Sequence, residues 1–325
     1  MSRSEQLSQW LNHVLETNDF RVETASEDAS FRQYFRVKCG DLSYIAMDAP
    51  PQLEDCRPFV KVQAILQQHQ VHVPLIKAHD EVMGFMLLTD FGHQLYLDLL
   101  NESNYHAMYA MAIDELVILQ SAPVDAIPAY DRPLLSTELN LFSEWFIGHH
   151  LNHQLTEQQQ LIVQQLHELL IDNALAQPQV FVHRDFHSRN LMWTDDKPGV
   201  IDFQDAVCGP VTYDLVSLLK DCYIRLPEPT VDDLISYYLQ QSGLAHKPAF
   251  SRTQFVRWFD LMGLQRHLKA IGIFSRLNYR DGKPGYLKDI PRTMSYVQDV
   301  CDCYPELSAL KQLLKEMLPT IRHPA

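Results

Sequence analysis

The sequence contains no apolar stretch long enough to span a bilayer, and it does not start with a charged-then-apolar signal pattern. We therefore expect a cytoplasmic protein that has no membrane partner. The six cysteines lack the paired spacing of a zinc site: Cys39, Cys56, Cys208, Cys222, Cys301 and Cys303. Reduced, half-buried thiols are the simpler interpretation.

Positive charge is also in short supply. The chain has 27 Lys and Arg against 41 Asp and Glu, a net charge of −14, which argues against nucleic acid or an anionic membrane as the main partner. Its 325 residues suffice for one large or two modest cores, and no internal repeat or low-complexity tract stands out. We expect a monomer or a weak homodimer.

The hydrophobic pattern predicts an α+β fold with two lobes. In the first lobe, residues 1–90, it predicts helices over 4–17 and 57–69 and strands over 31–38, 43–48, 73–79 and 83–89. In the second, residues 91–325, it predicts helices over 104–121, 136–148, 156–175, 212–224, 230–242, 251–274 and 290–316. We thus expect a small antiparallel-sheet lobe followed by a mainly helical one.

Two short apolar runs in the helical part flank the most informative polar residues of the chain. Asp185 is followed five residues later by Asn190, and Asp202 comes twelve residues after that. Transfer of a phosphoryl group from ATP needs such a set, because one Asp orients the attacking hydroxyl while an Asn and a second Asp hold Mg²⁺. We therefore predict a phosphotransferase with Asp185 as catalytic residue, Asn190 and Asp202 as metal ligands, and ATP and Mg²⁺ as cofactors.

Other polar residues near this set have simpler interpretations. His183 and Arg184 are expected to be loop scaffolding. Asp214 stands at the start of a helical pattern, where it can cap the helix or accept hydrogen bonds from the backbone of the catalytic segment. The sequence leaves both roles open.

The first lobe lacks two features that protein kinases use to hold nucleotide phosphates. Residues 24–31 contain no glycine, so we expect the hydroxyls of Ser26 and Ser30, with the backbone amides between them, to form the phosphate cradle. The strand over residues 44–48 contains no lysine. Our hypothesis is that Arg32 or Arg36 supplies part of the missing charge.

The motifs around Asp185 and Asp202, with segments 28–37, 47–51, 88–92 and 265–283, resemble the aminoglycoside phosphotransferase and choline kinase group of small-molecule kinases. Within that group the chain is most similar to bacterial kinases that phosphorylate the anomeric hydroxyl of N-acetylmuramate or N-acetylglucosamine in cell-wall recycling. The resemblance covers nearly the whole chain and implies a protein-kinase-like fold. It also implies that residues 87–92 form the hinge, where the backbone of Asp90 and Phe91 binds adenine.

The helical lobe must select the acceptor. The resemblance directs attention to Asp205, for a sugar hydroxyl, and to Gln265, Arg266 and Lys269 on one predicted helix, where a cation would suit the lactyl carboxylate of N-acetylmuramate. Polar residues at helical spacing also form solvated faces, and Asp205 can equally cap a loop. Which sugar and which anomer are used stays open.

Three other functions remain possible on this sequence. An aminoglycoside, choline or homoserine kinase would share the catalytic residues, although the C-terminal segment fits it poorly. A protein kinase is disfavoured because no Ala-Pro-Glu segment follows Asp202. A non-catalytic nucleotide-binding scaffold agrees with the missing lysine and glycines, but not with the complete set of Asp185, Asn190 and Asp202.

Overall fold

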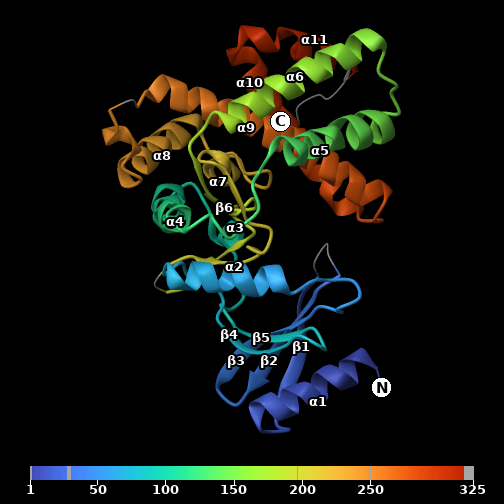
Figure 1. Cartoon of the computed structure of the whole chain (residues 1–325), viewed down its shortest axis with the longest axis vertical. Helices are drawn as coiled ribbons and strands as arrows, with labels where there is room; N and C mark the ends of the chain where they lie inside the picture. Colours follow the sequence, from blue (N-terminus) through green and yellow to red (C-terminus); the bar gives the residue numbers. More distant parts are fainter. Residues whose placement is uncertain (1, 28–30, 196, 249, 318–325) are drawn as a thin grey trace. The chain divides into compact units, whose positions relative to one another are not determined.

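The computed structural model describes residues 2–27, 31–195, 197–248 and 250–317. These residues form two compact units (Figure 1). The first comprises Met1–Gln94 together with Met192–Asp205, and the second comprises Leu95–Leu191 together with Ala206–Ala325. The sequence analysis places the boundary after residue 90 and does not foresee that residues 192–205 return to the first unit.

Contacts within the first unit explain this return. The backbone N–H of Val200 donates to the carbonyl of His72 over 2.8 Å. The ring of Phe203 packs against Phe59, with the ring centroids 4.8 Å apart. The segment that carries Asp202 is therefore folded against residues that precede it by more than a hundred positions.

The first unit is built on a five-stranded antiparallel sheet of order β1-β2-β3-β5-β4. Its strands are β1 (Arg21–Glu27), β2 (Gln33–Cys39), β3 (Leu42–Asp48), β4 (Ile76–Asp80) and β5 (Phe85–Thr89). Figure 1 shows the helices α1 (Arg3–Leu15) and α2 (Arg57–Gln68) on opposite sides of this sheet. The antiparallel sheet and both helices were predicted.

Helix α1 covers one face of the sheet through an apolar stripe. Leu7 and Leu11 are buried against Val37, Ala46 and Phe85 of the central strands. This stripe is the one that the sequence pattern predicts, because residues four apart lie on the same side of a helix.

Strand β1 was not predicted. It lies at the edge of the sheet and pairs only with β2, so its residues need no apolar alternation on two covered faces. Three of its first four residues, Arg21, Glu23 and Thr24, are polar and exposed. A strand of this kind is defined by its partner and not by its own hydrophobic pattern.

The second unit is mainly helical. Its α-helices are α3 (Tyr96–Leu99), α4 (Tyr105–Gln120), α5 (Arg132–Leu141), α6 (Glu157–Leu175), α7 (Tyr213–Leu219), α8 (Glu228–Gln241), α9 (Arg252–Tyr279), α10 (Ile290–Cys303) and α11 (Ser308–Met317). The antiparallel strands β6 (Gln179–Val182) and β9 (Val207–Pro210) form a two-stranded sheet in this unit. The short strand β7 (Leu191–Met192) pairs with β8 (Gly199–Val200), which belongs to the returning segment of the first unit. No helix in the described part of the chain is both long and apolar enough to cross a membrane.

Several predicted helices differ from those observed. The helix predicted over 212–224 ends at Leu219, and the one predicted over 251–274 continues to Tyr279. The helix predicted over 290–316 is two helices, α10 and α11, because the chain becomes extended at Tyr304 and Pro305 cannot continue a helix. The helix predicted over 136–148 begins at Arg132, where the Asp131 side chain accepts the backbone N–H of Leu134. It then continues as a π-helix over Phe142–His150.

Helix α9 runs through the middle of the second unit and contacts α5, α6, α7 and α10. Gly272 allows its closest approach to a neighbour. A Cβ atom at this position would lie 2.4 Å from the carbonyl carbon of Leu141, where α5 passes into the π-helix. Only glycine permits two backbones to approach so closely.

We predict that Gly272→Ala lowers the free energy of unfolding by about 1–3 kcal/mol, because the added methyl group overpacks a backbone contact. Gly263→Ala is the matched control in the same helix. Its Cβ would meet Val216 Cγ1 at 3.6 Å and the His267 ring at 3.9 and 4.0 Å, which are ordinary contact distances, and alanine favours the helix by about 1 kcal/mol. Urea denaturation of both variants measures the difference; equal stabilities would contradict the close-contact account.

Candidate active site

The loop of residues 183–190, which follows β6, carries Asp185 and Asn190. Its second residue, Arg184, has a left-handed backbone conformation, with a φ of 78°. The Asp214 carboxylate, at the start of α7, accepts the backbone N–H groups of His183 and Arg184 over 2.7 and 3.0 Å. Of the two roles left open by the sequence, Asp214 therefore has the second: it supports the loop.

Further hydrogen bonds fix the rest of this loop. The Asn190 side chain donates Nδ2–H to the carbonyl of Asp185 over 3.0 Å. The Ser188 backbone N–H and hydroxyl both donate to Asp221 Oδ2, over 3.0 and 2.5 Å. Because Asp214 and Asp221 are fully buried, the loop is held at two places by carboxylates that solvent does not reach.

The Asp185 carboxylate lies among cationic side chains. Burial raises its pKa, but Lys269, His187, Arg266 and Arg184 outweigh burial and bring the pKa down to about 2. Within the described residues, the carboxylate makes no hydrogen bond or ion pair of its own. Asp185 is therefore ionised at neutral pH while its oxygens are not engaged by a neighbouring side chain.

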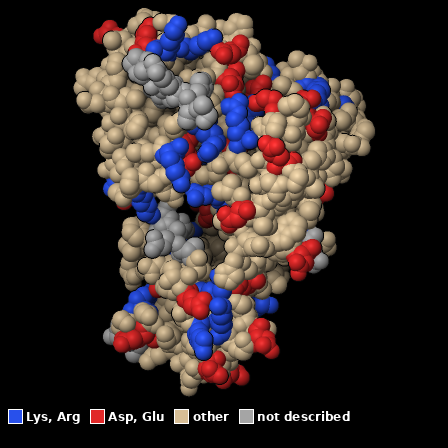
Figure 2. All heavy atoms as spheres, turned by 180° about the vertical axis from the view of Figure 1, so that it is seen from behind, with Lys and Arg blue, Asp and Glu red and all other residues tan. Residues whose placement is uncertain are grey.

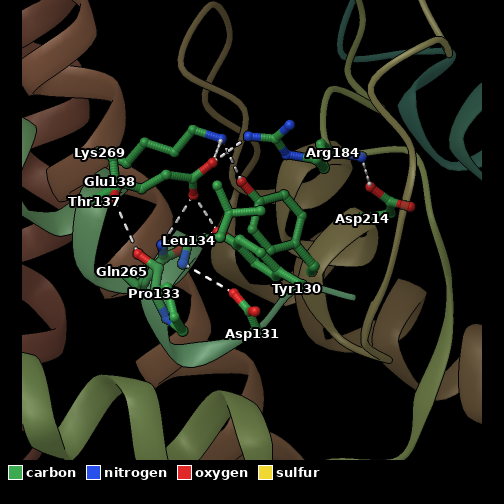
Figure 3. A network of polar contacts seen from close by, with 11 residues as sticks. Tyr130, Asp131, Pro133, Leu134, Thr137, Glu138, Arg184, Asp214, Gln265 and Lys269 are labelled. Carbon is green, nitrogen blue, oxygen red and sulfur yellow. Dashed lines mark hydrogen bonds and ion pairs between the residues drawn. The ribbon is translucent and has the colours of Figure 1, made fainter. Parts of the chain in front are cut away.

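Glu138 of α5 is a buried residue that the sequence analysis missed. Its Oε1 atom binds Arg184 and, over 3.0 Å, the Lys269 ammonium group. Its Oε2 atom accepts the Tyr130 hydroxyl and, over 3.4 Å, the Gln265 amide. Figure 3 shows these side chains converging on the Glu138 carboxylate. No local pattern marks Glu138, because its four partners come from three other segments of the chain.

Helix α9 supplies the polar residues predicted to face the acceptor. Gln265, Arg266 and Lys269 are 0%, 5% and 7% exposed, so they do not form the solvated face that was the alternative interpretation. Lys269 also donates to the Tyr213 hydroxyl over 3.0 Å. Arg266 differs from the other two, because its hydrogen bond is a 3.6 Å contact with Cys222 Sγ and its Nε has no hydrogen-bond partner among the described residues.

In the first unit, Asp202 lies with two other predicted site residues. Asp202 has a left-handed φ of 64° and accepts the Gln204 amide over 2.7 Å. Burial lowers the pKa of Arg32, but Tyr34, Glu54, Asp205 and Asp202 outweigh it and raise the pKa. Arg32 also forms an ion pair of 3.1 Å with Glu54. Arg32, Asp202 and Asp205 therefore share one electrostatic neighbourhood.

Arg36, the other candidate for the missing lysine, is already engaged. Its guanidinium binds the Asp90 carboxylate over 2.6 and 3.1 Å, and it also contacts His93 and the carbonyl of Gly92. Burial raises the pKa of Asp90, but its hydrogen bonds from Arg36 and Ser43 prevail and lower it. Arg36 and Asp90 thus form a structural pair in this unit.

The remaining predicted nucleotide-binding residues are Phe91, Ser26 and Ser30. The Phe91 ring packs on His72, with centroids 4.5 Å apart. Ser26 lies in β1, where its backbone pairs with Tyr34. Ser30 lies outside the described residues, so the phosphate cradle of Ser26 and Ser30 stays a prediction.

The donor chemistry for magnesium is present, although it is divided between the units. Asn190 belongs to the second unit and Asp202 to the first. Because Asn190 directs its amide nitrogen to the Asp185 carbonyl, its amide oxygen points the other way, as a ligand to a hard cation requires. Among the described residues, no group of three or more His, Cys, Asp or Glu has the arrangement of a metal site.

The concentration of cations around Asp185 is a feature of the interior. On the face drawn in Figure 2, Lys and Arg side chains are interspersed with Asp and Glu. In contrast, Arg266 and Lys269 are buried in the second unit together with Asp214 and Glu138. The electrostatics of this loop are thus set by buried groups, which salt screens less than surface charges.

The two-unit fold and the loop of Asp185 define a kinase-like phosphotransferase. A family model described as "Phosphotransferase enzyme family" matches residues 21–254, and the chain belongs to this family. Among solved structures, the chain is similar to an ADP-bound aminoglycoside phosphotransferase, with a TM-score of 0.60, 15% identity and coverage of 91% of this chain and 98% of the other. A choline/ethanolamine kinase family protein from Mesorhizobium loti gives a TM-score of 0.65, 12% identity and coverage of 96% and 100%.

Curated relatives are much closer in sequence. A protein of Pseudomonas putida named N-acetylmuramate/N-acetylglucosamine kinase is 47% identical over 97% of this chain and 96% of its own length. Proteins of the same name from Pseudomonas aeruginosa and Neisseria meningitidis are 44% and 43% identical, and the alignments cover 97% and 98% of this chain and 97% of each relative. The predicted fold class and the resemblance to this family are confirmed.

The buried Asp214 should make the free energy of unfolding depend on pH. Burial raises its pKa from 3.8 to about 7, although the two backbone N–H groups favour its ionised form. A carboxyl group with a higher pKa in the native state binds its proton more tightly when folded. Its contribution to the free energy of unfolding therefore falls by about 1.4 kcal/mol per pH unit across this window and is constant above it.

Asp214→Asn cannot ionise and should not show this fall. Urea denaturation of both proteins between pH 4.5 and 8 gives the difference in their free energies of unfolding. We expect the free energy of unfolding of Asp214→Asn, relative to that of the wild type, to increase as the pH rises to about 7. A difference that stays constant over the whole range would contradict the raised pKa.

Proposed function

We propose that this protein is an ATP- and Mg²⁺-dependent kinase that phosphorylates the anomeric hydroxyl of N-acetylmuramate and N-acetylglucosamine. The observation that carries the proposal is its identity of 43–47% over nearly the whole chain with three relatives that bear this kinase name. The loop that presents Asp185 agrees with it. We further propose that the protein acts in the cytoplasm, as a monomer or weak homodimer whose partners are ATP and the sugar.

Asp185 is proposed to bind and orient the sugar hydroxyl. A carboxylate with a pKa of about 2 is a weak base, so its main contribution is to hold the hydroxyl in line for attack on the γ-phosphate. An anomeric hydroxyl is more acidic than a simple alcohol and needs little help to lose its proton. Asp185 then accepts that proton late, as the bond to phosphorus forms.

Asn190 and Asp202 are proposed to hold the magnesium ion, through an amide oxygen and a carboxylate. The bound ion would neutralise charge on the transferred phosphate. Asp90 and Phe91 are proposed to bind adenine through their backbone, and Ser26 and Ser30 the phosphates.

Arg32 is proposed to replace the lysine that the strand lacks. Kinases usually pair that lysine with a glutamate, and here Arg32 pairs with Glu54 over 3.1 Å. The nitrogens of Arg36 are already bound to Asp90, Gly92 and His93, which favours Arg32 over Arg36.

The acceptor side of the proposal rests on Asp205 and α9. Asp205 is proposed to bind a sugar hydroxyl, and Arg266 the lactyl carboxylate of N-acetylmuramate, since Arg266 is a buried cation that forms no ion pair with a described residue. Contact of Gln265 and Lys269 with the sugar stays a prediction, because their side-chain nitrogens are directed at Glu138, Tyr130 and Tyr213.

An ATP-consumption screen tests the proposed function. We expect turnover with N-acetylmuramate and N-acetylglucosamine, and an acid-labile phosphate product that marks anomeric transfer. Aminoglycosides, choline and homoserine should support no turnover. Asp185→Asn should lower kcat by about 100-fold or more while the KM for ATP changes little, because hydroxyl orientation is lost and the nucleotide site is kept. Turnover with choline or an aminoglycoside alone would contradict the proposed substrate.

Arg32→Ala should raise the KM for ATP by about 10-fold or more, which is the cost of losing one charge-assisted hydrogen bond to a phosphate. Arg36→Ala is the comparison, and it should lower the free energy of unfolding more than it raises this KM. Steady-state kinetics and thermal unfolding separate the two effects. An unchanged KM for ATP in the Arg32 variant would refute its proposed role.

A further inference from the structure

Cationic side chains surround Asp185 and would block its carboxylate if they paired with it. Asp185 is half-buried, Lys269 is the cation that acts on it most strongly, and Arg184 is both a further cation that acts on it and its neighbour in the chain. A flexible cation near a buried carboxylate normally pairs with it, because their attraction is strong where water is excluded. Such a pair would occupy the oxygens that must receive the sugar hydroxyl. Yet neither cation is paired with Asp185.

Both cations bind Glu138 instead. Arg184 and the Lys269 ammonium group share its Oε1 atom, the latter over 3.0 Å. The Glu138 carboxylate is itself fixed, because its Oε2 atom accepts the Tyr130 hydroxyl and the Gln265 amide. Figure 3 shows both cations pointing to this one carboxylate. Glu138 is therefore a fixed competitor that binds two of the cations whose charges act on Asp185.

The position of Arg184 strengthens this arrangement. Its left-handed backbone, with a φ of 78°, immediately precedes Asp185 in the chain. Asp214 holds its backbone N–H and Glu138 holds its guanidinium. The conformation of Arg184, which orients Asp185, is thus fixed through both its backbone and its side chain. Only the side-chain contact depends on Glu138.

We propose that Glu138 is a positioning residue that withholds Lys269 and Arg184 from Asp185 and so keeps the Asp185 carboxylate open to the sugar hydroxyl. This inference rests on the proposed function. Glu138 touches neither substrate nor phosphate in this account. Its effect is confined to the step that Asp185 assists, so its loss lowers kcat and leaves the KM for ATP unchanged.

Three variants test the proposal. Glu138→Gln keeps the shape but releases both cations, and we expect kcat to fall by about 100-fold with the KM for ATP within about 3-fold of wild type. Lys269→Met breaks the same ion pair from the other side but releases no cation, so its kcat should fall by clearly less than that of E138Q. The double variant E138Q/K269M releases Arg184 alone, and its kcat should recover from that of E138Q. A purely structural ion pair predicts similar losses from either single change.

Asp260→Asn is the matched control for loss of a partly buried ion pair. Asp260 lies on α9 as well, pairs with Lys220 over 3.2 Å and accepts the Tyr304 hydroxyl over 2.8 Å. It should lower the unfolding temperature without lowering kcat. Circular dichroism melts establish that each variant is folded at the assay temperature. If E138Q does not fold, E138Q/K269M replaces it, and its kcat should lie below that of K269M.

The outcomes are distinct. A kcat for E138Q equal to that of K269M, or no recovery in the double variant, overturns the role of Glu138. If E138Q does not fold, equal kcat values for E138Q/K269M and K269M also overturn the role of Glu138. A wild-type protein that transfers no phosphate to either sugar overturns the proposed function and this inference with it. An active wild type together with an equally active E138Q overturns the inference alone.

Discussion

The arrangement of this molecule depends on carboxylates buried behind the loop of residues 183–190. Asp214 accepts two consecutive backbone N–H groups of the loop, and Asp221 accepts two donors from Ser188. Burying a carboxylate costs free energy unless hydrogen-bond donors compensate it. The loop is therefore stable in the conformation that lets its donor groups reach Asp214 and Asp221. Asp185 is consequently presented by a backbone that is fixed before any substrate arrives, which is the preorganisation that phosphoryl transfer requires.

In the same buried region, Asp214 and Asp185 have different electrostatic environments. Burial raises the pKa of Asp214, whereas Asp185 is also affected by burial but neighbouring cations outweigh it and lower its pKa. Asp214 meets backbone dipoles, while Asp185 meets the cations of α9 and of the loop itself. Two aspartates 29 residues apart in sequence thus have different tasks, because burial acts on both but the charges act mainly on one.

The first unit reaches a related solution with other residues. Two arginines of β2 and the turn before it looked equivalent as replacements for the missing lysine. The tertiary structure separates them: Arg36 is bound by Asp90, whereas Arg32 lies with Glu54 and in the field of Asp202 and Asp205. Asp202 reaches this neighbourhood because residues 192–205 fold back on the first unit.

Much of this was available from the sequence. The spacing of Asp185, Asn190 and Asp202, together with the period of the apolar residues, determined the phosphotransferase class, the antiparallel sheet and most helices, since these are local signals. Edge strand β1 and the break at Pro305 were missed because the first is defined by its partner and the second interrupts a continuous apolar stripe. Only the tertiary structure decided that Gln265 and Lys269 are buried, that Asp214 supports the loop, and that Glu138 belongs with Arg184. Those facts depend on contacts between side chains far apart in the chain, and no pattern within one segment encodes them.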